Sequence, residues 1–168
     1  MLLLFEVSLA GQSGDGKTPG TAYYGTISSP QSWTYAYNNG IIYVGQIGNE
    51  DLTIGTGGSL SIEPGITIYL CTNTTDLIVT GTGSITADGT PLSKITFTRN
   101  YPTFNYWGHI SFQTMGSAAA SLFDNCVIEY GDVSSFSVSD PHGGGGGIFI
   151  DFNNVSITNC TLQHNKSQ

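Results

Sequence analysis

Apolar and small polar residues alternate with a period of two along most of the chain, which is the pattern of half-buried β-strands. The clearest stretch, residues 51–65 (DLTIGTGGSLSIEPG), recurs without a gap as residues 76–90 (DLIVTGTGSITADGT), 25 positions later. Each copy holds two short alternating runs separated by a glycine cluster. Self-similarity at a period of about 20 to 50 residues is typical of solenoids, in which each repeat buries its apolar face against its neighbours.

A second repeat follows, because residues 123–130 (FDNCVIEY) align with residues 157–164 (ITNCTLQH) at an offset of 34. This alignment places an asparagine on an asparagine and a cysteine on a cysteine. Stacked asparagines at a tight turn predict a hydrogen-bonded ladder between coils. The longer period predicts that residues 100–108 and 132–147 bulge out as loops.

The cysteines of the second repeat, Cys126 and Cys160, are expected about one strand spacing apart, roughly 4.8 Å. Side chains stacked on parallel strands point alongside one another, so we expect both thiols to stay reduced. Three widely spaced cysteines (the third is Cys71) match neither a zinc site nor a disulfide framework.

Three segments are predicted from these patterns. Residues 1–10 are interpreted as the end of a secretory signal, or alternatively as a first edge strand. Residues 11–40, rich in tyrosine and including Trp33, are expected to cap the first coil, although a carbohydrate-stacking platform uses the same residue types. Residues 41–168 are predicted to form an all-β solenoid of about four to five coils.

The chain resembles the right-handed parallel β-helix proteins of the pectate-lyase-like superfamily. It is more similar to the secreted bacterial surface proteins known by their β-helix repeats. The segments that carry this resemblance are SLSIEPGITIYL (59–70), SITADGTPLSKITFT (84–98), YWGHISF (106–112), DNCVIEYG (124–131) and TNCTLQHN (158–165). The resemblance implies a right-handed parallel β-helix with further coils beyond residue 168. It implies no single activity, because the superfamily contains lyases, hydrolases, adhesins and passive scaffolds.

The charge of the chain limits its partners. Its net charge is −8, and its cations are Lys17, Lys94, Arg99 and Lys166. These do not cluster in sequence, which disfavours nucleic acids and anionic membranes. An anionic polysaccharide would meet a repulsive field unless a local patch overcame it. Neutral sugars and divalent cations remain compatible with this composition, whose abundance of glycine, hydroxyl and amide residues favours export.

The chain lacks the NTD, DD and GHG strings of polygalacturonases. NTTD at 73–76 has a different spacing, and WGH at 107–109 lacks the following glycine. We therefore expect a protein that is not an enzyme; the alternative is a fragment of a polysaccharide lyase or glycoside hydrolase whose active coils lie elsewhere.

Two loops offer candidate binding residues. The first brings together the aromatic residues Tyr101, Phe104, Tyr106 and Trp107, which predict stacking against sugar rings if their faces are exposed. The alternative is that this loop folds back over the coil as a plug.

The second loop contains carboxylates and an imidazole that suit calcium or a transition metal, namely Glu129, Asp132, Asp140 and His142. The alternative is a glycine hinge beside a solvated acidic face. No cofactor other than such a calcium ion is expected.

These observations predict a secreted or cell-surface module with a structural or adhesive role. Its expected partners are a polysaccharide or a surface protein, without nucleic acid and without membrane insertion. Self-assembly through an open terminal coil is a further alternative.

Overall fold

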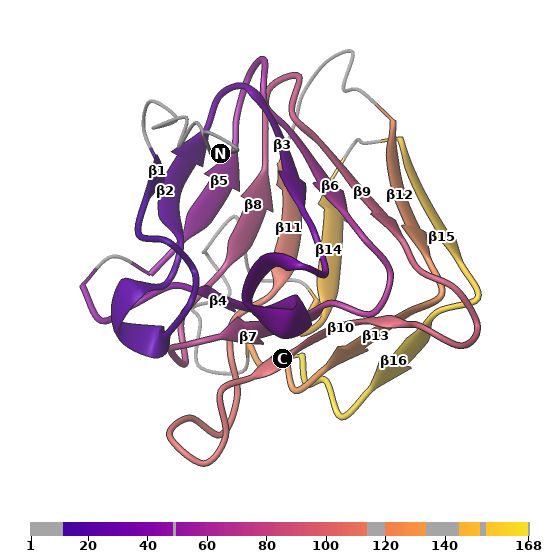
Figure 1. Cartoon of the computed structure of the whole chain (residues 1–168). Coiled ribbons are helices and arrows are strands. Elements are labelled where there is room, and N and C mark those ends of the chain that lie inside the picture. The colour runs from indigo at the N-terminus through magenta and orange to yellow at the C-terminus, as the bar shows by residue number, and fades with distance from the viewer. Residues whose placement is uncertain (1–11, 49, 114–119, 134–144, 152–153, 168) are drawn as a thin grey trace.

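The computed structural model describes residues 12–48, 50–113, 120–133, 145–151 and 154–167. Within them the chain winds through five coils of three short strands each (Figure 1). The first coil contains β2 (Tyr24–Ile27), β3 (Pro30–Trp33) and β4 (Ile41–Val44), and the second contains β5 (Leu52–Ile54), β6 (Ser59–Ile62) and β7 (Thr67–Leu70). The third contains β8 (Leu77–Val79), β9 (Ser84–Asp88) and β10 (Ile95–Arg99), and the fourth contains β11 (Ile110–Gln113), β12 (Ser121–Asp124) and β13 (Cys126–Glu129). The fifth contains β14 (Ile148–Asp151), β15 (Val155–Thr158) and β16 (Thr161–Gln163).

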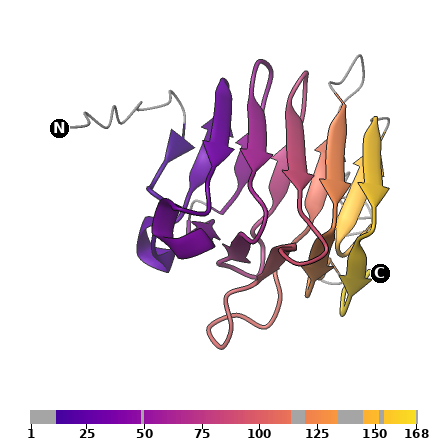
Figure 2. The same cartoon turned by 45° about the vertical axis from the view of Figure 1, so that its right-hand side comes forward.

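Equivalent strands of successive coils pair in parallel and form three sheets. Figure 2 shows the successive coils side by side along the solenoid. Sheet A contains β2, β5, β8, β11 and β14, sheet B contains β4, β7, β10, β13 and β16, and sheet C contains β3, β6, β9, β12 and β15. The short β1 (Gln12–Ser13) adds to β2 in the antiparallel direction. The structure is therefore the all-β parallel solenoid that the alternating pattern predicts.

The register of the second and third coils follows the sequence repeat. Leu52 pairs with Leu77, and Ser59 pairs with Ser84. Side chains alternate between the two faces of a strand, so this register points the apolar residues of every coil into one interior column. The offset of 25 residues thus predicted the strand pairing correctly.

The interior column is continuous along the solenoid. Most of its members are fully buried aliphatic residues, each of which stabilises the fold by about 1.5–3 kcal/mol relative to exposure. Aromatic residues widen it in the later coils, where the Phe123 ring lies 5.8 Å from that of Phe97 and 6.1 Å from that of Phe112 between centroids.

The cap predicted for residues 11–40 is too long. Both β2 and β3 fall in this range, yet they pair in parallel with β5 and β6 and belong to the first coil. The alternating pattern is broken there by Gly25, Pro30 and Gln31, and Gln31 occupies the position of the buried Leu60. The 3₁₀-helices η1 (Pro19–Thr21) and η2 (Tyr37–Gly40) complete this end of the described chain. The predicted signal segment lies outside the described residues.

The asparagines of the second repeat occupy the tight corner between sheets C and B. Asn125 and Asn159 adopt left-handed backbone conformations, with φ of 50° and 52°. The Asn159 amide donates to the Asp124 carboxylate of the preceding coil at 2.8 Å, and the Asn125 amide donates to the carbonyl of Gly89 at 3.4 Å. Hydrogen bonds between polar groups therefore link the coils at this corner. Between the last two coils the bond joins the Asn159 amide to the Asp124 carboxylate, and not to the Asn125 side chain.

All three cysteines are free thiols. The amide N–H of Cys126 points to the sulfur of Cys160 at 3.4 Å, as expected for residues in register on adjacent coils. In the described part of the chain, no helix is long and apolar enough to cross a membrane.

Candidate functional site

A polar groove of about 480 Å³ lies at the corner where the chain leaves sheet B. Three successive coils contribute to it, because each ends its sheet B strand at the same place. The lining consists of Arg99 at the end of β10, Asn105 and Tyr106 from the following loop, Tyr130 and Asp132 after β13, and His164, Asn165 and Lys166 after β16.

Planar groups from the three coils stack in this corner. The rings of Tyr130 and His164 are 5.1 Å apart between centroids and inclined by 12°. On the other face of Tyr130, the guanidinium carbon of Arg99 lies 3.8 Å from the ring centroid, and Tyr101 contacts the same guanidinium at 4.7 Å. Cation–π contacts of this kind stabilise by about 0.5–1 kcal/mol at exposed sites and more where water is excluded.

The stack depends on an unusual backbone turn. Tyr130 and His164 have φ of 64° and 56°, a left-handed conformation that non-glycine residues adopt rarely. Both residues directly follow the last residue of their strands, so the turn directs the chain out of sheet B at the same point in two coils. The shared conformation keeps the two rings aligned along the solenoid.

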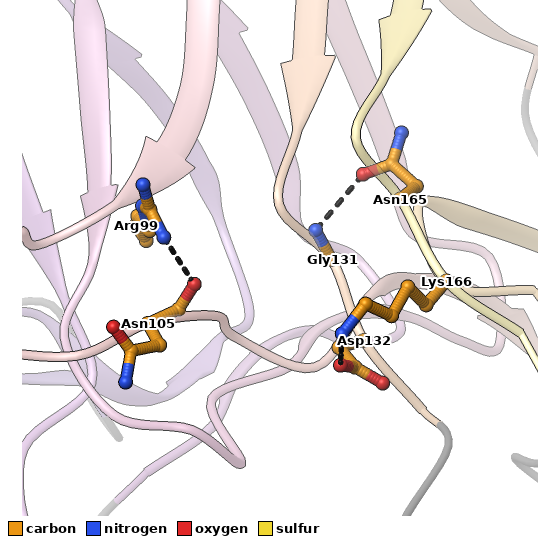
Figure 3. Close-up of polar contacts among 6 residues, drawn as sticks. All are labelled: Arg99, Asn105, Gly131, Asp132, Asn165 and Lys166. Atoms are coloured by element: carbon orange, nitrogen blue, oxygen red, sulfur yellow. Dashed lines mark hydrogen bonds and ion pairs between the residues drawn. The ribbon is translucent and has the colours of Figure 1, made fainter.

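Hydrogen bonds fix the walls of the groove (Figure 3). The side chain of Asn165 accepts from the backbone N–H of Gly131 at 2.9 Å and donates to the carbonyl of Ile128 at 2.9 Å, which joins the last two coils. Arg99 donates from Nη1 to the carbonyl of Asn105 at 2.6 Å and so fastens the loop to β10.

The groove also contains an ion pair. Lys166 Nζ lies 3.3 Å from Oδ2 of Asp132 (Figure 3). The side chain of the lysine is 70% exposed and that of the aspartate only 6%, so the pair sits at the boundary between protein and solvent. Among the described residues, no carboxylate lies within ion-pair distance of Arg99.

The four aromatic residues predicted to form one stacking surface are separated in the structure. Trp107 is fully buried in the core and donates from its indole N–H to the carbonyl of Glu129 at 2.7 Å, so neither ring face is open to a ligand. Tyr106 lines the groove and Tyr101 contacts Arg99. Phe104 lines a second cavity of about 510 Å³. Its other lining residues are Pro19, Gly20, Gln46, Ile47, Cys71, Asn100 and Thr103.

The residues predicted to hold a metal are only partly described. Glu129 accepts hydrogen bonds from Thr98 at 3.0 Å and from Gln163 at 2.7 Å, and Asp132 pairs with Lys166. Asp140 and His142 lie outside the described residues. In the part of the chain that the structure describes, no three His, Cys, Asp or Glu side chains gather in a way that could hold a metal ion.

Of the groove residues, the sequence prediction included Tyr106 and Asp132 but did not identify as site residues Arg99, Tyr130, His164, Asn165 or Lys166. The second repeat contained a signal for the groove, because the 34-residue offset places Tyr130 on His164 at the end of both segments. Arg99 could not be added from that repeat, since it precedes the first copy.

The chain matches no family model, no curated protein and no solved structure. The chemistry of the groove is therefore the basis for assigning a function.

Proposed function

We propose that the protein is a non-catalytic, secreted or cell-surface β-helix module with an adhesive role, and that it binds a saccharide in the groove beside Arg99. We further propose that its coils are right-handed, as in the pectate-lyase-like superfamily. The strong preference of parallel strand–crossover–strand connections for the right-handed sense supports this handedness.

The observation that carries the proposal is the composition of the groove. Its described lining residues combine planar rings (Tyr106, Tyr130 and His164) with amides and charged groups, and none of them is aliphatic. The rings of Tyr106 and His164 offer flat surfaces to the C–H faces of a sugar, while amides and ions bond to its hydroxyls. Tyr130 supports the His164 ring, because its own faces are covered by His164 and Arg99. Docked peptide helices and strands depend instead on apolar pockets or an open sheet edge, which this lining does not provide.

The rigidity of the groove supports the same proposal. Arg99 contacts two tyrosine rings, and Asn165 is bonded to the backbone of the neighbouring coil. Groups that are already ordered lose little freedom when a ligand binds, so more of the contact energy appears as affinity.

A glycan array probed with the whole chain, followed by calorimetry on any bound glycan, tests this proposal. Tyr106→Ala removes a lining ring, and His164→Asn removes another while keeping a residue that tolerates the left-handed conformation. Each is expected to weaken binding by about tenfold or more, or about 1.4 kcal/mol. Tyr35→Ala is the matched control, because Tyr35 is 54% exposed and lies outside the groove. No binding to any neutral or acidic glycan on the array, or unchanged binding by Tyr106→Ala, would overturn the proposal.

Self-association through the fifth coil is a second candidate function, and exposed apolar residues favour it. Ile150, Ile157 and Leu162 are 43%, 37% and 52% exposed. They pair in register with Phe112, Phe123 and Ile128 of the fourth coil, which are buried. Among the described strands, β14, β15 and β16 each have a neighbour on one side only, and such edges promote association.

Sedimentation velocity at increasing concentration tests this second function. Leu162→Asn places an amide on the exposed apolar end and is expected to reduce association. Leu92→Asn is the control, since Leu92 is 98% exposed but lies in the turn before β10. A chain that stays monomeric at high concentration would contradict self-association.

A further inference from the structure

We infer that the saccharide bound in the groove carries an anionic substituent, a carboxylate or a sulfate, and that Arg99 recognises it. This inference rests on the proposed function and adds the class of sugar. It runs against the net charge of −8, which by itself would disfavour an acidic ligand.

The local charge of the groove favours an anionic ligand. The chain has four lysines and arginines in total, and two of them, Arg99 and Lys166, line this one groove. Among the described residues of the lining, Asp132 is the only carboxylate, and it pairs with Lys166. The charge of Arg99 is therefore uncompensated by any described carboxylate at ion-pair distance, and a ligand anion would supply the missing partner.

The contacts of the Arg99 guanidinium also favour an anionic ligand. Tyr130 and Tyr101 contact Arg99 at 3.8 and 4.7 Å, and Nη1 bonds to the carbonyl of Asn105. Guanidinium carries five N–H donors in one plane, so most remain for another acceptor. A planar, stacked guanidinium suits two-pronged binding of carboxylate or sulfate oxygens, which a lysine ammonium cannot reproduce.

Of the described acidic residues, Asp132 alone lines the groove. Asp88 and Asp124 are paired neighbours at the end of sheet C, before the chain enters sheet B. Exposed charges separated by more than about 8–10 Å are largely screened at physiological salt. The field at the groove is therefore set mainly by Arg99 and Lys166 together with Asp132 and with Glu129, which directly precedes Tyr130 and accepts hydrogen bonds from Thr98 and Gln163.

Matched ligand pairs test the inference by calorimetry on the whole chain. One pair is a glucuronic-acid-containing disaccharide and its carboxyl-reduced form, and the other is a sulfated disaccharide and its desulfated form. We expect at least one anionic form to bind about tenfold or more tightly than its neutral counterpart. The pair that shows the difference identifies whether the substituent is a carboxylate or a sulfate.

Variants assign the discrimination to one side chain. Arg99→Gln is expected to abolish the preference for the anionic form, and Arg99→Lys is expected to retain little of it. Lys94→Gln is the matched control, because it removes the same charge near the other end of β10 and lies outside the groove. The salt dependence of binding to the unmodified chain tests the inference without any variant that could misfold. Added salt should lower the affinity for the anionic form and leave the affinity for the neutral form unchanged.

The outcomes separate the two proposals. Equal binding of anionic and neutral forms would overturn the inference and leave saccharide binding in place. Equal loss of preference in Lys94→Gln and Arg99→Gln would also overturn it, because the effect would then come from net charge. If neither member of either pair binds and the glycan array is silent, both proposals fail.

Discussion

Asp51 and Asp76 occupy the same position in successive coils, and the backbone N–H of Asp76 donates to Oδ1 of Asp51 at 3.0 Å. The bond recurs one coil later, where the N–H of His109 donates to Oδ1 of Asp76 at 2.9 Å. The aspartate that begins each copy of the sequence repeat therefore joins two successive coils by a hydrogen bond. It satisfies a backbone donor at the entrance to sheet A, which the parallel ladder leaves unpaired at that point.

Replacement of Asp76 should destabilise the solenoid. Asp76 is 7% exposed, so Asp76→Ala leaves a buried N–H of His109 without its acceptor, at an expected cost of about 1–3 kcal/mol. Asp76→Asn keeps a carbonyl oxygen and should lose less. Urea denaturation measures both changes. Asp88→Ala is the control, because Asp88 is exposed, and it should stay within about 0.5 kcal/mol of wild type. An equal loss in Asp76→Ala and Asp88→Ala would contradict the role assigned to Asp76.

The corner asparagines should tolerate glycine better than alanine. Asn125 has φ of 50°, where a Cβ atom costs about 1–2 kcal/mol, and asparagine offsets this cost by local hydrogen bonds. We expect Asn125→Ala to destabilise the fold more than Asn125→Gly, as measured by thermal and urea denaturation. At Ser61, an exposed position inside β6, the order should reverse, because glycine is the poorer strand residue there. The same order at both sites would rule out backbone conformation as the cause.

Acid should weaken the junction between the fourth and fifth coils. Hydrogen bonds from Thr158 and Asn159 hold the pKa of Asp124 below its ordinary value of 3.8. A carboxylate whose pKa is lower in the folded state stabilises the fold above the pKa of the unfolded chain. That stability is lost as the pH falls below 3.8 and through the folded-state pKa.

Thermal melting between neutral pH and strong acid measures this effect. Asp124→Asn should be less stable than wild type at neutral pH, and the difference should shrink as the pH falls through the acid range. A difference that stays constant with pH would show that the charge of Asp124 does not contribute.

Two of the three thiols should be unreactive in the folded protein. Burial raises the pKa of Cys71 to about 12, and burial together with the adjacent Cys160 thiol raises the pKa of Cys126. The thiolate is the reactive form, so both residues should resist alkylation at pH 8 and react after denaturation. Cys160 is half-buried and should be modified first. Mass spectrometry of peptides after iodoacetamide treatment checks the order, and rapid native labelling of Cys126 would contradict it.

The fold was predictable where residue spacing alone sets the pairing. The 25-residue offset gave the register of β5 on β8 and of β6 on β9, and the 34-residue offset aligned Asn125 with Asn159. The first two strands of the first coil, β2 and β3, were not predictable, because Gly25 and Pro30 lie in strands whose pairing comes from the next coil rather than from their own propensity.

The groove was harder to predict than the fold. Its central stack joins Arg99, Tyr130 and His164, which are 31 and 34 positions apart and follow loops of different length. Aromatic composition also misled the prediction, because it does not distinguish the fully buried Trp107 from the groove residue Tyr106. Burial depends on where the loop after β10 returns to the coil, and that path is a tertiary property.

The most direct test of saccharide binding at this corner is an NMR titration of the isotopically labelled chain with the tightest glycan from the array. Binding in the groove predicts that the largest amide shifts gather at Asn105, Tyr106, Gly131 and residues 164–166. The outward face of sheet C, which includes Ser61 and Thr86, should remain unchanged. Shifts concentrated on sheet C, or no shifts at saturating glycan, would contradict the assignment of the groove as the binding site.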